Sequence, residues 1–265
     1  MNITYLLKQV FTSKANYQKL FKILTIIGAV VLLSTGCKKE RVIDTKPISS
    51  PEKPNPLSFA DSIYFEVDGK TYALNSTFSN GVYNGGVGVR PLDKPLPGMR
   101  DWGSRGGKLI YAPVDSIYFS YFKAFSSSKV NQTVHVYFGK GFHTRDMNKF
   151  GALWYPKDIR KILQKGEQEF ATDHQSNNTL DGVYLAFNHF GSSGMPEFTF
   201  DAVDKYSQDG ANFEIINTEQ INENYYRIQA KFNLNVYDVN RGKYNVSKGF
   251  LRLTVSRDWH NTRFF

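Results

Sequence analysis

Cysteine is almost absent from this chain of 265 residues, in which Cys37 is the only one. A lone cysteine excludes a disulfide within the chain, so the fold has to be held by its core rather than by cross-links. Methionine is also scarce, with 4 residues, whereas 16 Tyr and 21 Phe are present. Aromatic rings suit the pleated, half-buried surface of a sheet, so this composition favours a β-rich core.

Acidic residues are missing from residues 1–36, which contain a charge-free apolar run from Ile23 to Leu33. Four lysines precede that run: Lys8, Lys14, Lys19 and Lys22. A basic region followed by a short apolar run is the layout of a secretory signal. The run is about half of the ~20 residues that cross a bilayer. We therefore expect an export signal at residues 1–36, with a signal-anchor helix and an incidental thiol as the alternative.

The residues after the apolar run are small and lead directly to the cysteine, as Ser34-Thr35-Gly36-Cys37. This stretch resembles a bacterial lipoprotein signal, and Cys37-Lys38-Lys39-Glu40 resembles the mature start of lipoproteins from Bacteroidota-type bacteria. The sequence departs from the usual pattern at one position, because Ser34 stands where Leu is common and Leu33 lies one residue earlier.

The resemblance implies cleavage between Gly36 and Cys37 and acylation of Cys37, with palmitate among the attached chains. Each buried methylene contributes ~0.8 kcal/mol, so two or three chains hold a protein stably on a membrane. The implied location is the outer membrane of the cell envelope, with the chain facing the periplasm or the cell exterior. The implied partner is the membrane itself, reached through the lipid on Cys37.

Residues 37–58 are rich in proline and poor in large apolar groups. Such a segment cannot bury enough surface to offset the entropy of ordering it, so we expect a disordered, extended tether. About 200 residues remain for a folded domain, predicted at residues 59–258, and residues 259–265 form a C-terminal tail.

The formal charge of +9 overstates how basic the chain is after the predicted signal. Removing the four lysines of residues 1–36 leaves 29 basic against 24 acidic side chains, or about +5. We find neither a basic stripe nor a nucleic-acid motif in this sequence, so no nucleic-acid partner is expected.

Asp68-Gly69 gives the clearest turn signal, because it separates the alternating stretches Ile63–Val67 and Lys70–Leu74. A type I′ turn needs positive φ at both central residues, which Asp-Gly provides, so this segment predicts a β-hairpin. The glycines between residues 79 and 90 predict an edge strand interrupted by glycine.

Residues 226–236 alternate without a break between apolar and polar side chains, and residues 244–255 repeat the alternation after a turn at residues 238–243. This pattern predicts an antiparallel strand pair with one buried face, and Gly249 is the expected position of a bulge. Further strands are expected at residues 109–111, 133–138, 183–189, 197–203 and 213–218. Residues 116–125 are aromatic on both faces, which predicts a strand covered on both sides.

One helix is expected, at residues 157–165, where Ile159, Ile162 and Leu163 have helical spacing and Gly166 is a suitable stop. Many short strands with frequent turns predict an all-β fold, either an antiparallel β-sandwich or an open barrel, with this one short helix. A small-ligand barrel would in addition need an apolar cavity.

Four short motifs resemble β-rich domains of unknown function in Bacteroidota lipoproteins: residues 65–70 (FEVDGK), 166–167 (GE), 181–183 (DGV) and 248–250 (KGF). The likeness covers most of residues 60–256. It implies a location and a fold type, and it brings no chemistry with it.

Catalytic and metal-binding motifs are missing from the sequence. The five histidines have neither HxH nor HxxxH spacing, and the serines near glycine do not match GxSxG. Residues 204–210 echo a calcium loop, but Tyr206 and Gln208 occupy oxygen positions and no closing Glu follows, so a turn is expected. We therefore expect no catalytic residue, metal or cofactor.

Two groups of aromatic and basic residues are candidates for ligand binding. Arg100, Trp102 and Arg105 lie in residues 91–108, which we interpret as a long polar loop, and Trp154 and Tyr155 follow later. Such rings stack on sugars, or Trp102 instead folds back on the domain. The first hypothesis is a non-catalytic binding or structural module, which has a carbohydrate or another envelope protein as its partner. The alternative is a glycan-binding or glycan-processing surface lipoprotein.

Overall fold

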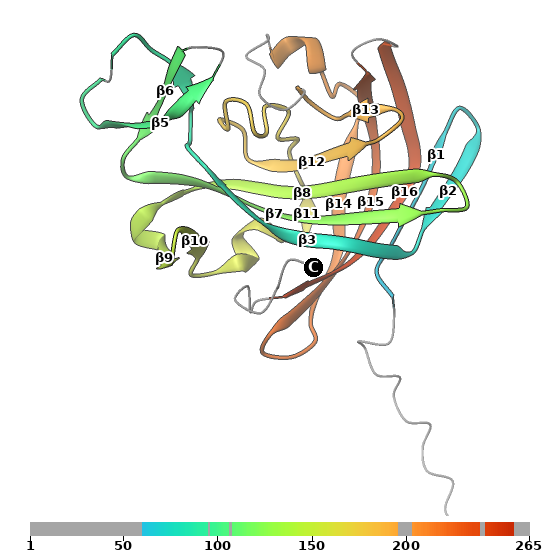
Figure 1. Cartoon of the computed structure of the whole chain (residues 1–265). Coiled ribbons are helices and arrows are strands. Elements are labelled where there is room, and N and C mark those ends of the chain that lie inside the picture. The colour runs from blue at the N-terminus through green and yellow to red at the C-terminus, as the bar shows by residue number, and fades with distance from the viewer. Residues whose placement is uncertain (1–59, 95, 106–107, 196–202, 239–241, 257–265) are drawn as a thin grey trace, which may run out of the picture. The chain divides into compact units, whose positions relative to one another are not determined.

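Alternating apolar residues produce strands along nearly the whole folded part of the chain. The computed structural model describes residues 60–94, 96–105, 108–195, 203–238 and 242–256. An antiparallel sheet of eleven strands curls into a half-barrel (Figure 1), which confirms the all-β prediction. The signal, Gly36, Cys37, the tether and the C-terminal tail lie outside the described residues, as does the predicted strand at residues 197–203 except for Val203, which begins a 3-10 turn.

The main sheet has the strand order β2-β1-β16-β15-β13-β12-β8-β7-β3, and β14 pairs with both β15 and β11. Its strands are β1 (Ser62–Val67), β2 (Lys70–Leu74), β3 (Ser76–Gly85), β7 (Ser116–Ser127), β8 (Gln132–His143), β11 (Gly166–Glu167), β12 (Gly182–Phe187), β13 (Gly191–Ser192), β14 (Asn212–Gln220), β15 (Tyr225–Asp238) and β16 (Gly242–Ser256). The glycine-containing β3 lies at one end of this order, as predicted for an edge strand.

Both hairpins predicted with a turn are present. β1 pairs with β2, with Val67 opposite Lys70, and the turn between them has φ of 50° at Asp68 and 73° at Gly69. β15 pairs with β16 along almost their entire lengths. The residues that the alternation placed on the core face, from Tyr226 to Val236, are buried. Arg227 and Asn235, which it placed on the solvent face, are buried as well, so the prediction of one fully wet face is wrong at these two positions.

The bulge in β16 lies just before Gly249 rather than at it. Phe232 faces Gly249 and Leu234 faces Val246, so the extra residue falls within residues 247–248, where Lys248 has φ of 50°. The absence of a side chain at Gly249 matters for packing, since a Cβ there would meet the Phe232 ring at 2.3 Å. Gly249 therefore makes room for this ring, which stacks on Phe213 at 5.7 Å.

The core fills the space inside the curled sheet. The sheet has two parts: one holds β1, β2, β14, β15 and β16, and the other holds β3, β7, β8, β12 and β13. β15 connects them, because it pairs with β14 in the first part and with β13 of the second part through Tyr237 and Ser192. Rings from the two parts meet: Phe65 lies 5.1 Å from Phe187, and Phe138 lies 5.9 Å from Phe213. The described interior is thus packed with side chains from both parts, as in a sandwich.

The segment from residue 170 to residue 181 covers the other face of β7, β8 and β12. Tyr137, Tyr184 and Ala171 form a second buried cluster there, and Tyr118 of β7 is also completely buried. Asp173 organises the segment, because its carboxylate accepts hydrogen bonds from the Thr179 N–H, the Thr179 hydroxyl and the Leu180 N–H. β7 is therefore covered on both faces, as its aromatic sequence predicted.

The helix predicted at residues 157–165 is wrong in type and length. The segment forms a short 3-10 turn, Ile159–Ile162, closed by a bond from the Leu163 N–H to the Arg160 carbonyl at 3.1 Å. Ile159, Ile162 and Leu163 are all buried, as their spacing suggested. One turn is enough to bury three side chains, and a segment this short gains too few hydrogen bonds to nucleate an α-helix.

The long loop predicted at residues 91–108 is also wrong. β4 (Arg90–Pro91), β6 (Lys108–Pro113) and β5 (Met99–Arg105) form a separate three-stranded sheet. Val89, Ile110 and Ala112 are buried in its own small core, which offsets the cost of ordering a polar segment.

The remaining described elements are small. β9 (Met147–Phe150) and β10 (Leu153–Pro156) form a hairpin, and 3-10 turns cover Thr144–Asp146 and Val203–Tyr206. The residues compared with a calcium loop thus begin in a 3-10 turn. Among the described residues, no helix has the length and apolar character needed to cross a membrane.

Candidate functional site

The first predicted group of ligand-binding residues lies on β5. Arg100 stacks over the Trp102 ring, with its guanidinium carbon 4.5 Å from the ring centroid. Trp102 is half-buried and packs against Val89, Ile110 and Ala112 as well as against the main core. Trp102 therefore folds back on the domain, which was the alternative given for it. Arg105 is the last residue of β5, and its side chain lies outside the described atoms.

The second predicted group lies on β10. Tyr155 is buried in the main core, 6.4 Å from the Phe119 ring. Trp154 is half-buried and carries the Lys149 ammonium 5.6 Å from its ring centroid. The two groups belong to different small sheets, and none of the hollows described below is lined by any of the five residues.

A hollow that the sequence did not predict lies on the outer face of the main sheet, over β14, β15, β16 and β1. It has a volume of about 520 Å³. Its lining is Tyr64, Asn212, Glu214, Lys231, Phe232, Asn233, Lys248, Gly249 and Phe250. Lys248 and Gly249, at the β16 bulge, are part of this lining, and a bulge bends a strand and increases the local twist.

Strand register aligns four outward side chains of this hollow in one row. Glu214 faces Lys231, Lys231 faces Phe250, and Phe250 faces Tyr64. We call these four residues the outer row. Directly opposed side chains in an antiparallel sheet lie close enough to touch, so the row places a carboxylate, an ammonium and two rings side by side.

Charged and amide groups surround the outer row. The Lys248 ammonium lies 2.9 Å from the Glu66 carboxylate, and this ion pair raises the pKa of Lys248. The Arg252 guanidinium lies 6.0 Å from the Phe250 centroid, and Asn212 faces Asn233 across the strands. Rings flanked by amides and charges provide both an apolar surface and hydrogen-bonding groups.

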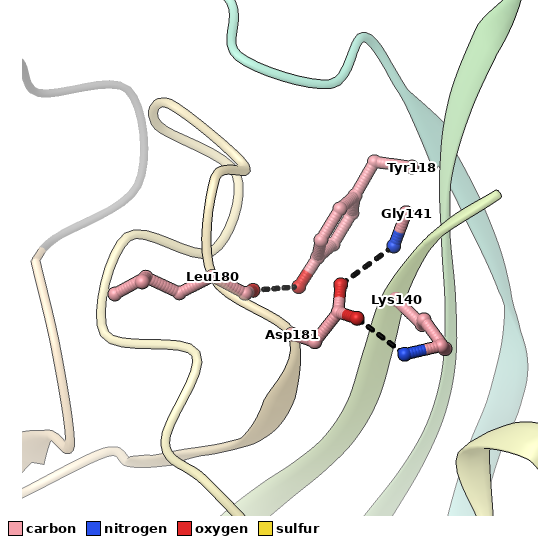
Figure 2. Close-up of polar contacts among 5 residues, drawn as sticks. All are labelled: Tyr118, Lys140, Gly141, Leu180 and Asp181. Carbon is pink, nitrogen blue, oxygen red and sulfur yellow. Dashed lines mark hydrogen bonds and ion pairs between the residues drawn. The ribbon is translucent and has the colours of Figure 1, made fainter.

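A second hollow, of about 210 Å³, lies between β8, the 3-10 turn at residues 159–162 and the segment that precedes β12. Figure 2 shows the contacts at its edge. The Asp181 carboxylate pairs with the Lys140 ammonium and accepts a bond of 2.8 Å from the Gly141 N–H. The Tyr118 hydroxyl donates to the Leu180 carbonyl at 3.0 Å.

These contacts attach the segment at residues 170–181 to β7 and β8. Burial raises the pKa of Tyr118 well above its ordinary value, and the nearby Asp173 and Asp181 carboxylates raise it further. Tyr118 therefore stays protonated and acts as a hydrogen-bond donor. Lys140 and the Gly141 N–H hold the Asp181 carboxylate in place, so the contacts at this edge of the hollow stabilise the fold.

His174 is a buried polar residue that sequence reasoning did not single out. It is 1% exposed and lies within 6 Å of four tyrosine ring centroids, those of Tyr83, Tyr118, Tyr137 and Tyr184. Neither ring nitrogen has a hydrogen-bond partner among the residues that the structure describes. Burial lowers the pKa of His174 to about 3, so the ring is neutral at ordinary pH. A single His in a polar stretch carries no signal that would reveal this cage.

Among the described residues, no group of three or more His, Cys, Asp and Glu side chains is placed to hold a metal ion. Ser192 and Ser193 serve the backbone: the Ser192 hydroxyl donates to the Gly194 carbonyl at 2.8 Å, and the Ser193 hydroxyl accepts from the Leu185 N–H at 2.9 Å. No protein-family model matches the chain, and neither curated protein sequences nor solved structures show a significant similarity to it.

Proposed function

We propose that this chain is a lipid-anchored protein of the cell envelope whose β domain is a non-catalytic binding or structural module. The observation that carries the proposal is Ser34-Thr35-Gly36-Cys37 placed directly after the apolar run, with Cys37 the only cysteine of the chain. The proposed anchor is a set of acyl chains on Cys37, held in the outer membrane. Residues 38–58 then connect the anchor to the β domain.

The roles of the charged groups support binding rather than catalysis. Glu66 is paired with Lys248 beside the outer-face hollow, and Asp181 is paired with Lys140 beside the second one. A general acid or base needs access to a substrate proton, whereas these two carboxylates are engaged by neighbouring ammonium groups. The outer-face hollow, with rings and amides side by side, suits recognition of a ligand.

Metabolic labelling with a fatty-acid analogue tests the anchor. The protein expressed in a bacterium with lipoprotein processing should take up label, and Cys37→Ser should abolish the uptake because the acyl acceptor is gone. A matched Ser34→Ala variant, which keeps a small residue before the cysteine, should retain the label. Label that persists in Cys37→Ser would defeat the proposal.

Glycan binding is the second candidate function, and the outer row favours it. Tyr64 is 37% exposed and lies beside Phe250, with Glu214 in the same row and Asn212 and Asn233 near it. Sugars present apolar C–H faces to rings and hydroxyls to amides and carboxylates. This site differs from the one expected around Trp102, which is used in packing.

Affinity electrophoresis through gels that contain soluble polysaccharides tests this second candidate. Retardation should disappear in Tyr64→Ala and in Phe250→Ala. It should persist in Phe78→Ala, a matched change of another exposed ring, on β3. If no polysaccharide retards the parent chain, glycan binding is contradicted. If both Tyr64→Ala and Phe250→Ala are retarded as much as the parent, glycan binding at this hollow is contradicted.

A further inference from the structure

Positive charge is concentrated in one segment of the folded chain. Residues 140–165 contain seven basic and two acidic side chains, a net charge of +5. The other residues between 60 and 265 contain 17 basic and 19 acidic side chains, a net charge of −2. The segment therefore carries all of the positive excess of the folded part.

Most of these cations face solvent, and we call the exposed ones the basic segment: Arg145, Lys149, Lys157, Arg160, Lys161 and Lys165. Lys157 and Arg145 lie together, since the Lys157 ammonium donates to the Arg145 carbonyl at 2.8 Å. Arg160 is paired with Asp158. Among the described residues, no carboxylate lies within ion-pair distance of the ammonium groups of Lys149, Lys161 or Lys165.

The tip of the β9–β10 hairpin is apolar, and in the sequence it lies between Lys149 and Lys157 of the basic segment. The β9–β10 turn is Gly151-Ala152, flanked by Phe150 and Leu153, which face each other across the strands. Phe150 is 59% exposed, and Lys149 beside it lies over the Trp154 ring. Hairpin turns in water are normally polar, so an apolar turn bordered by cations and a Trp has the composition of a membrane-interface element.

The hairpin is held rigidly. The Asn84 side chain of β3 accepts from the Trp154 N–H at 2.6 Å and donates to the Trp154 carbonyl at 3.0 Å. Tyr155 anchors the base of β10 in the main core. In Figure 1 the hairpin lies below β7 and β8, away from the β1–β2 hairpin. A tip fixed in this way loses little conformational entropy when it meets a surface.

We propose that the basic segment and the β9–β10 tip form a docking surface for an anionic lipid bilayer. The cations meet the lipid headgroups, while Phe150 enters the boundary between headgroups and acyl chains. The contact would press the domain against a membrane, in addition to any anchor at Cys37. An acidic polysaccharide or a nucleic acid would satisfy the cations, but it would give the apolar tip no surface to enter.

Vesicle co-sedimentation of the unacylated chain, residues 37–265 with Cys37→Ser, tests this docking separately from the lipid anchor. All core residues lie between Ile63 and Val255, so the tested chain contains the complete described core. It should sediment with vesicles that contain phosphatidylglycerol and stay in solution with phosphatidylcholine alone. Added salt should weaken the binding, because the screening length falls from ~10 Å at 0.1 M to ~3 Å at 1 M.

Matched variants locate the surface. Lys149→Glu should weaken vesicle binding at least about fivefold, because a cation near an anionic surface contributes ~1 kcal/mol. Lys243→Glu, an exposed change on β16, should have a smaller effect. Phe150→Ser should weaken binding, whereas Phe78→Ser, another exposed ring on β3, should not.

Three results would overturn the proposal. The first is no binding to anionic vesicles by the parent chain. The second is an equal loss of binding in Lys149→Glu and Lys243→Glu, or in Phe150→Ser and Phe78→Ser. The third is that the chain binds a short duplex DNA as tightly as it binds the vesicles, and that Lys149→Glu weakens both kinds of binding equally.

Discussion

Replacing His174 should remove a defined part of the acid sensitivity of this domain. The folded state holds His174 neutral, with a pKa of about 3 against an ordinary value of 6.5, because the ring is buried among tyrosines. In the unfolded chain the same ring takes up a proton below about pH 6.5. Unfolding is therefore favoured as the pH falls from 6.5 towards 3, and the effect is absent above 6.5.

The size of the effect follows from the two pKa values. One proton taken up on unfolding lowers the free energy of unfolding by ~1.4 kcal/mol per pH unit. Between about pH 7 and about pH 4.5 this amounts to roughly 2.5 kcal/mol, a large share of the stability of a typical domain. His174→Phe keeps an aromatic ring in the cage and loses no hydrogen bond, because neither nitrogen has a partner in the described part of the chain.

Urea unfolding of both proteins at several pH values measures this difference. The carboxylates are common to both chains, so their titration cancels when the two pH profiles are subtracted. We expect the parent protein to lose roughly 2.5 kcal/mol more than His174→Phe over this range. Parallel profiles for the parent and His174→Phe would refute the reasoning, as would a His174 ring that titrates near pH 6.5 by NMR.

Other changes test the packing. Asp173→Ala should lower the free energy of unfolding by about 2–4 kcal/mol, because two backbone N–H groups and the Thr179 hydroxyl lose their acceptor; a thermal midpoint unchanged from the parent's would contradict this. Gly182→Ala should cost on the order of 3 kcal/mol or more, since φ is +131° and a Cβ would lie 2.0 Å from the Glu169 carbonyl oxygen. The matched Gly210→Ala, with positive φ and open space, should cost less by the same urea assay. Lys123→Met should cost about 2 kcal/mol in urea unfolding, because it leaves the nearly buried Asp61 carboxylate without its ion pair, and an unaffected midpoint would argue against that role.

Patterns local in sequence predicted the fold well. The Asp68-Gly69 turn and the β15–β16 pair were predictable because a turn type or a period of two fixes both the strand and its buried face. The α-helix predicted at residues 157–165 was wrong, because helical spacing indicates which residues are buried but not whether the segment can form enough hydrogen bonds for an α-helix. Residues 91–108 were misjudged because their strands are stabilised by a small core whose members are far apart in sequence.

The candidate sites depend on register, which the sequence alone does not give. Tyr64 and Phe250 are separated by most of the chain, and they become neighbours only through the pairing of β1 with β16. The sequence pattern of rings near charges predicts a ligand site at Trp102 and Tyr155, but in the structure both rings pack in or against the core. His174 sits in a cage built from β3, β7, β8 and β12, and no local pattern connects those strands.

The lipid anchor at Cys37 is tested most directly by the mass of the N-terminal peptide from protein extracted from the membranes of the cells that make it. The account predicts that the mature chain begins at Cys37 and that this peptide is heavier than its sequence by the mass of the attached acyl chains. A peptide that still contains residues from the segment 1–36, or one that begins at Cys37 with no added mass, would contradict it.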